Sequence, residues 1–284
     1  MKKNYKNLKE KNLNHISNIS SVWFFLDTGI NDGIFNMSCD NFLLDSVSNN
    51  SIKLPLLRVY GWTKPTLSIG ANQLFDELIH CQQNFSSIIA GGAEREVSRA
   101  RNSVTKLWRV PEGDRTRSDG GDTRLIEKYP TVKRITGGQA VLHGVSDDEL
   151  TYSIFVNYGY KVKQLYFEVG EVLLEFLNIY NLKGEFGHSS NNYFKHFDCF
   201  SSKTEADIVV NDIKVIGSAQ YRKKEYVLQH GSIKLDMIRK LSGKNTNFED
   251  AKINLKKAFQ DKLNIEFRDY TLKSSLNIFC GSNT

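Results

Sequence analysis

The feature that most limits the fold is one stretch with helical spacing, residues 162–177, which lies between two groups of short β-rich runs. Its apolar residues, at positions 162, 165, 166, 169, 172, 173, 176 and 177, all fall on one helical face. A helix with one apolar face buries that face against another layer, and the β-rich runs can supply a sheet. We therefore predict an α+β fold with a mainly antiparallel sheet flanked by a few helices.

The predicted strands are short runs that are apolar or alternate between apolar and polar residues. They cover residues 22–27, 56–60, 66–69, 132–135, 140–142, 149–156, 206–210, 214–216 and 226–235. Lys64-Pro65 indicates a turn between the second and third runs. Asn211-Asp212 indicates a hairpin turn between residues 206–210 and 214–216.

Two further helices are predicted from residues that favour helix starts. Asn36 is the expected cap of a helix that extends to about residue 47. Asn247, with Asp250 three residues later, is the expected capping pair of a last helix to about residue 263. A side-chain oxygen at the cap position accepts a hydrogen bond from a backbone N–H that the first helical turn leaves free.

The composition excludes several classes of protein. The chain has 284 residues, of which 40% are hydrophobic and 25% are charged, so it can bury a core in one or two domains. No apolar run reaches the ~18 residues of a transmembrane helix, and no signal-peptide core follows the polar N-terminus. The four Cys form no CxxC pair, which argues against a zinc site and a disulfide scaffold. We expect no metal and a reducing, cytoplasmic setting.

The excess positive charge is confined to two segments. The net charge of +6 divides into +4 in residues 1–11, +2 in residues 90–125 and none elsewhere. Residues 90–125 contain seven of the twelve Arg and are interrupted by Gly and Pro, so we predict an inserted surface loop there. This insert is either solvated or an electrostatic clamp for an anionic substrate. A basic nucleic-acid-binding module is an alternative, although the neutral body argues against it.

The predicted domain organisation follows from these boundaries. Residues 1–20 form a flexible Lys-rich tail, and residues 21–270 form a single domain that the 90–125 insert interrupts. Residues 271–284 form a C-terminal tail.

The first segment with possible chemistry runs from Arg134 to His143 and contains Gly137-Gly138. Two adjacent glycines between strands let a backbone approach a ligand closely and leave N–H groups available as donors. A glycine pair also occurs in ordinary tight turns, and a single His is more often a packing residue than a catalyst. The pattern alone therefore leaves both interpretations open.

The second segment joins Lys214 to the small residues Gly217, Ser218 and Ala219. A Lys flanked by apolar residues would place an ammonium group beside a wall of small side chains. Such a group can hold an anion or lower the pKa of a neighbouring acid. The alternative is a strand Lys whose ammonium points into water.

The third segment contains Cys199, in a polar stretch before a predicted strand. Cys39 falls in the first helix pattern, Cys81 precedes the insert and Cys280 lies near the C-terminus, so each has an ordinary structural explanation. A partly exposed thiol beside a Lys is a candidate nucleophile, because the cation favours the thiolate.

Several of these segments together resemble the superfamily of lipoate-protein ligase A and the octanoyltransferases, which shares its catalytic fold with the biotin ligases. The resembling segments are residues 35–40, 58–62, 65–70 with Gln73, 134–143, 149–152, 217–220 and 229–232. They span most of the chain in the family's order. The 90–125 insert departs from the usual pattern, in which the Gln73 region leads more directly to the glycine pair.

The resemblance implies a biotin/lipoate ligase-like (BPL/LPL) catalytic domain and a set of site residues. Cys199 followed by Phe200 looks like the LipM-type octanoyltransferases, in which the matching Cys forms an acyl-thioester and the matching Lys, here Lys214, lowers its pKa. The implied substrate-binding residues are Arg134, Thr136, Gly137, Gly138, His143, Gly217, Ser218 and Ala219. We also expect Ile135, Val141 and Ile216 to line the slot for the acyl chain.

The resemblance also implies a reaction and its partners. An octanoyl group would pass from an acyl carrier protein to Cys199 and then to a lysine of a lipoyl-domain protein, such as the glycine cleavage H protein or a 2-oxoacid dehydrogenase E2. No cofactor, membrane or nucleic acid is expected. An ATP-dependent lipoate ligase and an amidotransferase acting between lipoyl-domain proteins remain alternatives.

Overall fold

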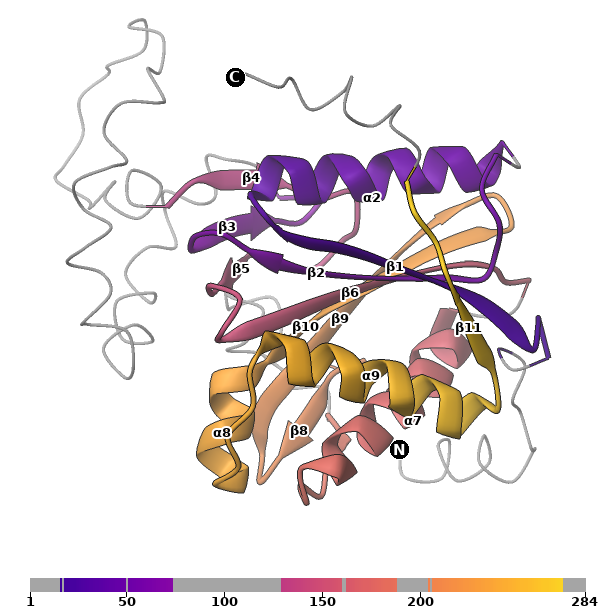
Figure 1. Cartoon of the computed structure of the whole chain (residues 1–284). Coiled ribbons are helices and arrows are strands. Elements are labelled where there is room, and N and C mark those ends of the chain that lie inside the picture. The colour runs from indigo at the N-terminus through magenta and orange to yellow at the C-terminus, as the bar shows by residue number, and fades with distance from the viewer. Residues whose placement is uncertain are drawn as a thin grey trace, which may run out of the picture.

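The centre of the protein is an eight-stranded sheet. The computed structural model describes residues 16–73, 129–187, 204 and 206–272, except 17, 50, 160 and 161. Its strands are β1 (Val22–Asn31), β2 (Leu56–Trp62), β6 (Glu149–Asn157), β7 (Glu185–Phe186), β8 (Ile208–Val210), β9 (Ile213–Lys223), β10 (Tyr226–Lys234) and β11 (Glu266–Asp269). They are ordered β11-β1-β2-β6-β10-β9-β8-β7 (Figure 1). Among the described strand pairs of this sheet, only β11–β1 and β1–β2 are parallel, so the prediction of a mainly antiparallel sheet is confirmed.

A second, smaller sheet contains β3 (Thr66–Ile69), β4 (Thr131–Lys133) and β5 (Val141–His143), in the order β4-β3-β5. The turn predicted at Lys64-Pro65 does separate two strands, but those strands belong to different sheets. The chain therefore leaves the large sheet after β2 and starts the small one with β3. This change brings the Gly137-Gly138 loop close to the end of β3, because the Ala71 N–H donates to the Thr136 carbonyl oxygen.

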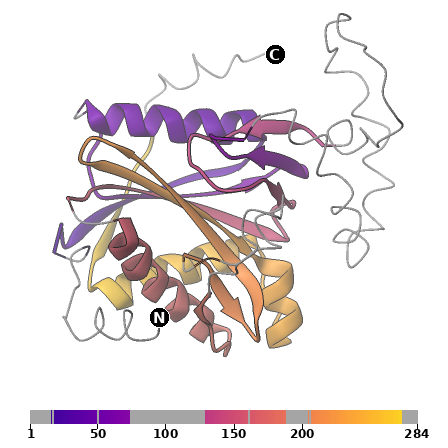
Figure 2. The ribbon, with the colours of Figure 1, turned by 180° about the vertical axis from the view of Figure 1, so that it is seen from behind.

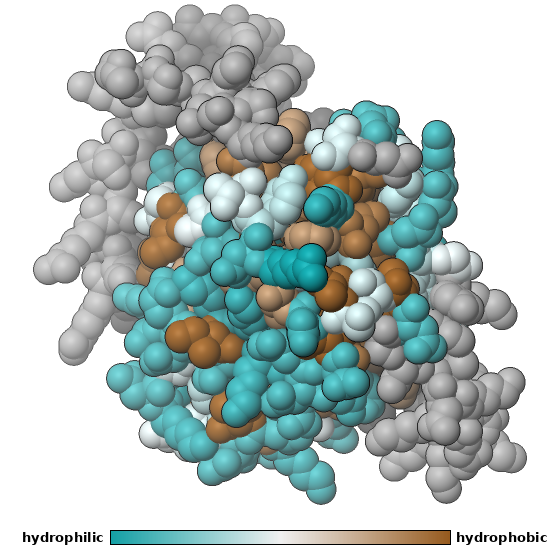
Figure 3. Space-filling view, turned by 45° about the vertical axis from the view of Figure 1, so that its right-hand side comes forward, coloured by the Kyte–Doolittle hydropathy of each residue, from teal (hydrophilic) through white to brown (hydrophobic). Residues whose placement is uncertain are grey.

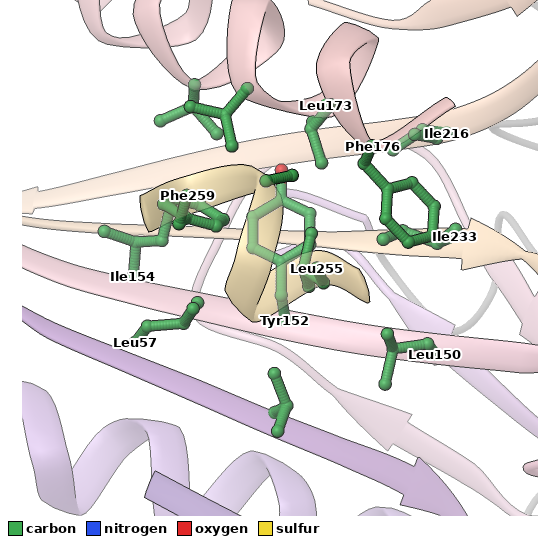
Figure 4. Close-up of a cluster of buried hydrophobic side chains, with 14 of the residues drawn as sticks. Leu57, Leu150, Tyr152, Ile154, Leu173, Phe176, Ile216, Ile233, Leu255 and Phe259 are labelled. Atoms are coloured by element: carbon green, nitrogen blue, oxygen red, sulfur yellow. The ribbon is translucent and has the colours of Figure 1, made fainter. Parts of the chain in front are cut away.

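Helices cover both faces of the large sheet (Figures 1 and 2). Helix α2 (Gly33–Ser48) lies on one face, and α7 (Val162–Ile179), α8 (Leu235–Ser242) and α9 (Phe248–Leu263) lie on the other. The main core lies between the sheet and α7 and α9, where Tyr152 and Leu173 meet (Figure 4). A second, smaller core lies beneath α2. The helical spacing of residues 162–177 thus predicts α7 correctly.

The start of α2 differs from the prediction. Asp32, not Asn36, caps the helix, and its side chain accepts a hydrogen bond from the Phe35 N–H at 2.8 Å. Asn36 lies inside the helix and is fully buried, where its side chain donates to the Gly61 carbonyl oxygen and accepts from Arg58. An Asx residue four positions earlier was available to cap the helix, so the Asn36 amide serves a tertiary contact instead.

Two local predictions are confirmed. Asn211 and Asp212 have φ values of 49° and 63°, and they join the antiparallel strands β8 and β9, as expected for a hairpin turn with two left-handed residues. The Asn247 side chain accepts from the Asp250 N–H at 2.9 Å and begins α9, which ends at Leu263.

Three elements were not predicted: β7, α8 and β11. The first has two residues, and β11 has the sequence Glu-Phe-Arg-Asp with mostly exposed side chains. Such short or polar segments become strands only because a neighbouring strand pairs with them. Helix α8 begins at Leu235, the residue that the prediction gave to the end of a strand.

The described residues also bear on the predicted tails. Ile16, within the predicted N-terminal tail, is buried in the main core, and Leu272, within the predicted C-terminal tail, packs against the second core. The insert at residues 90–125 lies outside the described residues. None of the helices in the described ranges has the length and apolar composition needed to cross a membrane. The lower part of the face shown in Figure 3 is largely hydrophilic, with separate apolar residues.

Candidate functional site

A cavity lies where the small sheet meets strands β6, β9 and β10 of the large one. Among the described residues its walls contain Met37, Tyr60, Ser68, Arg134, Gly138, Val141, His143, Thr151, Thr204, Asp207, Gly217, Ser218, Ala219, His230, Gly231 and Ser232. Six of the predicted substrate-binding residues are in this set: Arg134, Gly138, His143, Gly217, Ser218 and Ala219. The cavity thus brings together the first two segments selected from the sequence.

The remaining predictions for this wall have mixed outcomes. Thr136 lies next to the cavity, since its hydroxyl is 2.6 Å from Nε2 of the lining residue His230. Val141 lines the cavity as expected. Ile216 packs in the main core instead (Figure 4), and Ile135 packs against the second core. Neither is among the described residues of the cavity wall.

The floor of the cavity owes its shape to small residues on two paired strands. Gly217 of β9 pairs with Ser232 of β10, and Ser218 pairs with Gly231. A Cβ atom on Gly231 would lie 2.7 Å from both the Gly217 carbonyl oxygen and the Tyr152 ring, so the backbone leaves no space for one. Small side chains side by side on a sheet leave room above it for a ligand.

The two residues of the glycine pair, Gly137 and Gly138, have different surroundings. Gly138 has φ of +93°, a conformation that L side chains rarely adopt. A Cβ atom on Gly70 would lie 2.0 Å from the Gly138 carbonyl oxygen, so the loop packs directly on the end of β3. At Gly137, by contrast, a Cβ atom would meet no described atom within 4 Å. Gly137 has room for a side chain, but it is not among the described residues of the cavity wall.

Arg134 holds the loop in this shape. Its Nη1 donates to the Ser68 carbonyl oxygen at 2.9 Å and to Ser68 Oγ at 3.2 Å. Its Nη2 donates to the carbonyl oxygens of Gly137 and Gln139 at 3.0 and 2.6 Å. Both terminal nitrogens are therefore engaged with the protein, and the guanidinium shapes the cavity wall as well as lining it.

Two chains of buried polar groups end near this loop. We call the first the Glu149 chain: Lys234, Glu149, His143 and Ser68. His143 Nδ1 lies 2.5 Å from Glu149 Oε1, and His143 Nε2 lies 2.8 Å from Ser68 Oγ. Lys234 Nζ forms a very short ion pair with Glu149 Oε2. The His143 ring stacks on Trp62, with centroids 3.8 Å apart.

The second, the Asp40 chain, contains Arg58, Asp40, His230 and Thr136. Arg58 Nη1 lies 2.6 Å from Asp40 Oδ1, and both side chains are buried. His230 Nδ1 lies 3.2 Å from Asp40 Oδ2, and its Nε2 lies 2.6 Å from Thr136 Oγ1. The chain thus connects helix α2 and β2 to the glycine loop through β10.

The electrostatics of both chains follow from burial and charge pairing. Burial by itself would raise the pKa of Glu149, but Lys234 and His143 outweigh it and hold the pKa well below its usual range. Burial by itself would also raise the pKa of Asp40, but Arg58 and His230 outweigh it, so this pKa is lowered. Burial lowers the pKa of His143, helped by Lys234 and Arg134 and opposed by Glu149, so this ring is neutral at neutral pH.

Lys214 does not point into water. It is 5% exposed, and its Nζ lies 3.0 Å from Asp207 Oδ1, with both side chains buried. The other oxygen of Asp207 accepts from the N–H and the hydroxyl of Thr204 at 2.7 and 3.0 Å. Burial raises the pKa of Asp207, against the opposing effect of Lys214 and Thr204. Asp207 and Thr204 line the cavity, so Lys214 lies directly beside its wall.

Comparison with known proteins now identifies the family. The family model described as the lipoyl protein ligase A/B catalytic domain matches residues 123–267. The chain belongs to this family. Two of its relatives are named octanoyltransferase LipM, one from Oceanobacillus iheyensis and one from Geobacillus kaustophilus, and they are 30% and 28% identical to this chain. The first alignment covers 76% of this chain and 64% of that protein, and the second covers 88% and 90%.

The fold of the lipoyl protein ligase family is also seen among solved structures. Ta0514, a candidate lipoate protein ligase of T. acidophilum with bound lipoic acid, has a TM-score of 0.58 and 18% identity to this chain. The match covers 88% of this chain and 90% of that one. The predicted α+β fold of the lipoate and biotin ligases is therefore confirmed.

Several residues of this family member's site had no role assigned from the sequence. They are Asp40, Arg58, Ser68, Glu149, Asp207, His230 and Lys234. A signal for some of them exists: Arg58 lies in an otherwise apolar strand, and both Glu149 and His230 lie in strands that are buried at every position except the last. A charged residue inside a buried strand requires a partner, although the sequence does not say which.

The predicted nucleophile, Cys199, lies outside the described residues, as do Cys81 and Cys280. Cys39 is described, and it is fully buried in the second core. Among the residues that the structure covers, no three His, Cys, Asp or Glu side chains gather in a way that would hold a metal ion.

Proposed function

We propose that this protein is an octanoyltransferase that moves an octanoyl group from an acyl carrier protein to a lysine of a lipoyl-domain protein. Its relatives named octanoyltransferase LipM, at 28–30% identity over most of the chain, support this activity. Lipoyl domains are the acceptors that membership of the lipoyl protein ligase family suggests. The reaction needs a reduced thiol, which agrees with a cytoplasmic location.

The observation that carries the proposal is the position of Lys214. Asp207 holds the Lys214 ammonium with one carboxylate oxygen and Thr204 with the other. Thr204 follows Cys199 by five residues in the sequence. The proposal joins a buried cation at the cavity wall to the Cys199 thiol, and these are the two parts of an activated nucleophile.

The proposed reaction has two steps. In the first, the Cys199 thiolate attacks the acyl carbon, its Sγ–C bond forms, the bond from that carbon to the carrier sulfur breaks, and the carrier leaves as a thiolate that takes a proton from water. In the second, the neutral ε-amine of the acceptor lysine attacks, the amide C–N bond forms, the bond to Sγ breaks, and the nitrogen gives up one proton to a base as Cys199 leaves as a thiolate. Lys214 stabilises that thiolate in both steps, since an adjacent cation favours the charged form.

The glycine loop is the proposed site for the acyl carbonyl group. Gly137 faces open space, and its backbone N–H is a suitable donor for an oxygen that becomes negative during each attack. Met37, Tyr60 and Val141 supply apolar surface on the described walls. Each methylene group of the acyl chain that leaves water contributes about 0.8 kcal/mol.

Intact-mass measurement tests the nucleophile. Incubation with octanoyl-carrier protein, without ATP, should add one octanoyl group that neutral hydroxylamine removes. Cys199→Ala should abolish the adduct, and Cys39→Ala is the control, because an Ala side chain is tolerated better than a hydroxyl in the buried environment of Cys39. An adduct that persists in Cys199→Ala would refute the proposed mechanism.

A second experiment tests the role of Lys214. Lys214→Met should raise the apparent pKa of the thiol, which is measured as the pH dependence of alkylation by iodoacetamide. Lys223→Met removes a half-exposed lysine paired with Asp45 and is the matched control. A double variant, Lys214→Met with Asp207→Asn, removes the carboxylate that would otherwise be buried without its cation. An unchanged alkylation profile in the single and double variants would assign Lys214 a structural role only.

The alternative enzymes differ in their donors. A lipoate ligase would modify the acceptor only with a free fatty acid and ATP, whereas an amidotransferase would accept octanoyl-H protein as the donor. Product formation from octanoyl-carrier protein without ATP separates the proposed activity from the first. Comparing the two acylated proteins as donors separates it from the second.

The dispensability of the insert stays a prediction. β3 and β4 are neighbouring parallel strands, so the chain between Gln73 and Tyr129 must return from the end of β3 to the start of β4. Removing residues 90–125 leaves 19 residues, 74–89 and 126–128, for this connection, and such crossovers need about a dozen. We expect the deletion, closed by a Gly-Ser bridge, to preserve folding and acylation. Loss of acylation at every salt concentration would place the insert in the active site.

A further inference from the structure

The Glu149 chain ends at Ser68, a fully buried residue of the cavity wall. Ser68 and His143 both line the cavity, and the carboxylate, imidazole and hydroxyl are joined at 2.5 and 2.8 Å. The same three types of group, in the same order, move a proton in serine hydrolases. The Asp40 chain contains a similar series, but its hydroxyl, that of Thr136, is not among the described groups that line the cavity.

The hydrogen-bond partners determine the direction of the protons in the Glu149 chain. Ionised Glu149 can only accept, so His143 Nδ1 carries the proton of the neutral ring. His143 Nε2 then accepts, and Ser68 Oγ donates to it. Arg134 donates to Ser68 Oγ from the other side at 3.2 Å. Ser68 therefore directs its proton at an imidazole nitrogen that has a free electron pair.

The second step of the proposed reaction releases one proton. As the lysine nitrogen bonds to the acyl carbon and the bond to the Cys199 sulfur breaks, that nitrogen must lose a proton to become an amide. Lys214, as the cationic partner of Asp207, has no electron pair with which to accept it. The departing Cys199 thiolate can hold this proton at the end of the step, but the amine benefits from an acceptor at the cavity while its bond to the acyl carbon forms.

We propose that the Ser68–His143 pair accepts the proton of the attacking lysine amine. The amine proton passes to Ser68 Oγ while the proton of Ser68 passes to His143 Nε2, and Glu149 stabilises the resulting imidazolium. The proton then returns through Ser68 to the departing thiolate or to water. This inference rests on the proposed octanoyl transfer, and it concerns only the second of the two steps.

The surroundings of His143 suit this role. Glu149 faces one ring nitrogen, with Ser232 Oγ 3.3 Å from the same nitrogen, and Trp62 stacks on the ring face. Burial, helped by Lys234 and Arg134, lowers the pKa of His143 and so keeps the resting ring neutral. Because the ring is held on every side that the structure describes, it can exchange a proton without changing its position.

Single-turnover kinetics on the full-length chain test the proposal. The enzyme is first loaded from octanoyl-carrier protein, which intact mass confirms, and is then mixed with a lipoyl domain or with hydroxylamine. Hydroxylamine is an unprotonated nucleophile at neutral pH and does not depend on a base in the way that lysine does. His143→Asn retains a donor toward Glu149 and removes the accepting nitrogen, while Ser68→Ala removes the hydroxyl group.

We expect both variants to transfer octanoyl to lysine about 100-fold more slowly than wild type at pH 7, the usual scale of general-base catalysis. Loading and hydroxylamine release should change less than about threefold, which is small on that scale. The deficit in transfer should shrink toward pH 9.5, because more of the lysine is then unprotonated. His230→Asn, from the Asp40 chain, is the matched control and should lower loading, release and transfer in the same proportion.

Three results would overturn the proposal. Transfer at the wild-type rate in both variants would remove the pair from the reaction. An equal loss of loading, release and transfer in His143→Asn and in Ser68→Ala would show that the pair only maintains the site. If wild-type enzyme acquires no octanoyl mass at all, the proposed function fails and the relay fails with it, and the mass measurement distinguishes that case from the other two.

Discussion

The Glu149 chain and the Asp40 chain contain the same kinds of residue but differ in their surroundings. Each joins a cation, a carboxylate, an imidazole and a hydroxyl group, and each ends beside the glycine loop. The cation of the Asp40 chain, Arg58, is completely buried, whereas the Lys234 side chain of the Glu149 chain is 15% exposed. Under the proposed relay, chemical type alone does not assign a role to either chain, because the two differ in whether the residue with the terminal hydroxyl is among the described residues of the cavity wall.

The choice of cation agrees with this division. The Arg58 guanidinium donates to Asp40, to the Asn36 carbonyl oxygen, to the Asn36 side chain and to Thr28. Its planar group thereby fixes β1, β2 and α2 together, as a multidentate donor can. Lys234 donates to Glu149 and to the Leu142 carbonyl oxygen. It neutralises the carboxylate without joining as many elements.

The largest expected effect separates the two chains by stability. Asp40→Asn leaves the Arg58 charge buried without its carboxylate, and we expect it to lower the free energy of unfolding by about 3–5 kcal/mol. Urea unfolding at pH 7 measures this loss. Asp45→Asn, on the same helix, breaks an exposed pair with Lys223 and should cost less than about 1 kcal/mol. Equal losses in the two variants would show that the Asp40 chain is not a structural anchor.

The next effect comes from Glu149 and depends on pH. Glu149→Gln should cost about 2–3 kcal/mol at pH 7, below the range for a fully buried pair because Lys234 retains some contact with water. The native pKa of Glu149 lies below its unfolded value, so the ionised group stabilises the fold fully above about pH 4.3 and progressively less as the pH falls toward the native pKa. The difference between variant and wild type should therefore shrink below pH 4.3. A difference that stays constant down to pH 3 would contradict this account.

A smaller effect tests the packing of His143. Trp62→Phe removes the indole that stacks on the imidazole and donates from Nε1 to Thr151 Oγ1 at 2.8 Å. We expect a loss of about 1–2 kcal/mol, the cost of one hydrogen bond and part of an aromatic contact. Thermal unfolding measures it. Under the proposed relay, transfer to lysine should fall more than hydroxylamine release, because the ring loses its support.

The smallest expected effect is that of Tyr60, an aromatic residue that contacts the Asp40 chain. The Tyr60 hydroxyl donates to Asp40 Oδ2 at 3.3 Å, a long hydrogen bond, and its ring lies 3.9 Å from the Arg58 guanidinium. Tyr60→Phe keeps the ring and should cost only about 0.5–1 kcal/mol. Urea unfolding beside Asp40→Asn would show it, and a loss as large as that of Asp40→Asn would mean that the hydroxyl, not Arg58, dominates the chain.

Sequence patterns predicted the parts of the fold that depend on neighbouring residues. The apolar spacing of α7, the hairpin at Asn211-Asp212 and the Asn247 cap all act over a few positions. β11 could not be found in this way, because its four residues are a strand only when β1 lies beside them. The cap of α2 was misplaced because two Asx residues compete there, and only the fold shows which one has a tertiary partner.

The candidate site shows the same difference between features that depend on neighbouring residues and features that depend on distant ones. The glycine loop and the small residues of β9 could be selected from the sequence because they have little or no side chain, and Gly138, Gly217, Ser218 and Ala219 do line the cavity. The two chains could not be predicted, since Asp40 and His230 are 190 positions apart and Glu149 and Lys234 are 85 apart. No local pattern reports which buried charge meets which partner. The resemblance to the family marked several of these residues without giving their contacts.

The position of β11 has a consequence for how the chain is made. β1 pairs on one side with β2, which follows it soon after in the sequence, and on the other with β11, whose Glu266 lies opposite Val22. During synthesis the second edge of β1 must therefore wait until almost the whole domain has left the ribosome. Until then it exposes unpaired backbone N–H and C=O groups beside Phe24 and Phe25, which is the condition for pairing with a strand of another chain. Pairing with β11, the last strand among the described residues, covers this edge of β1.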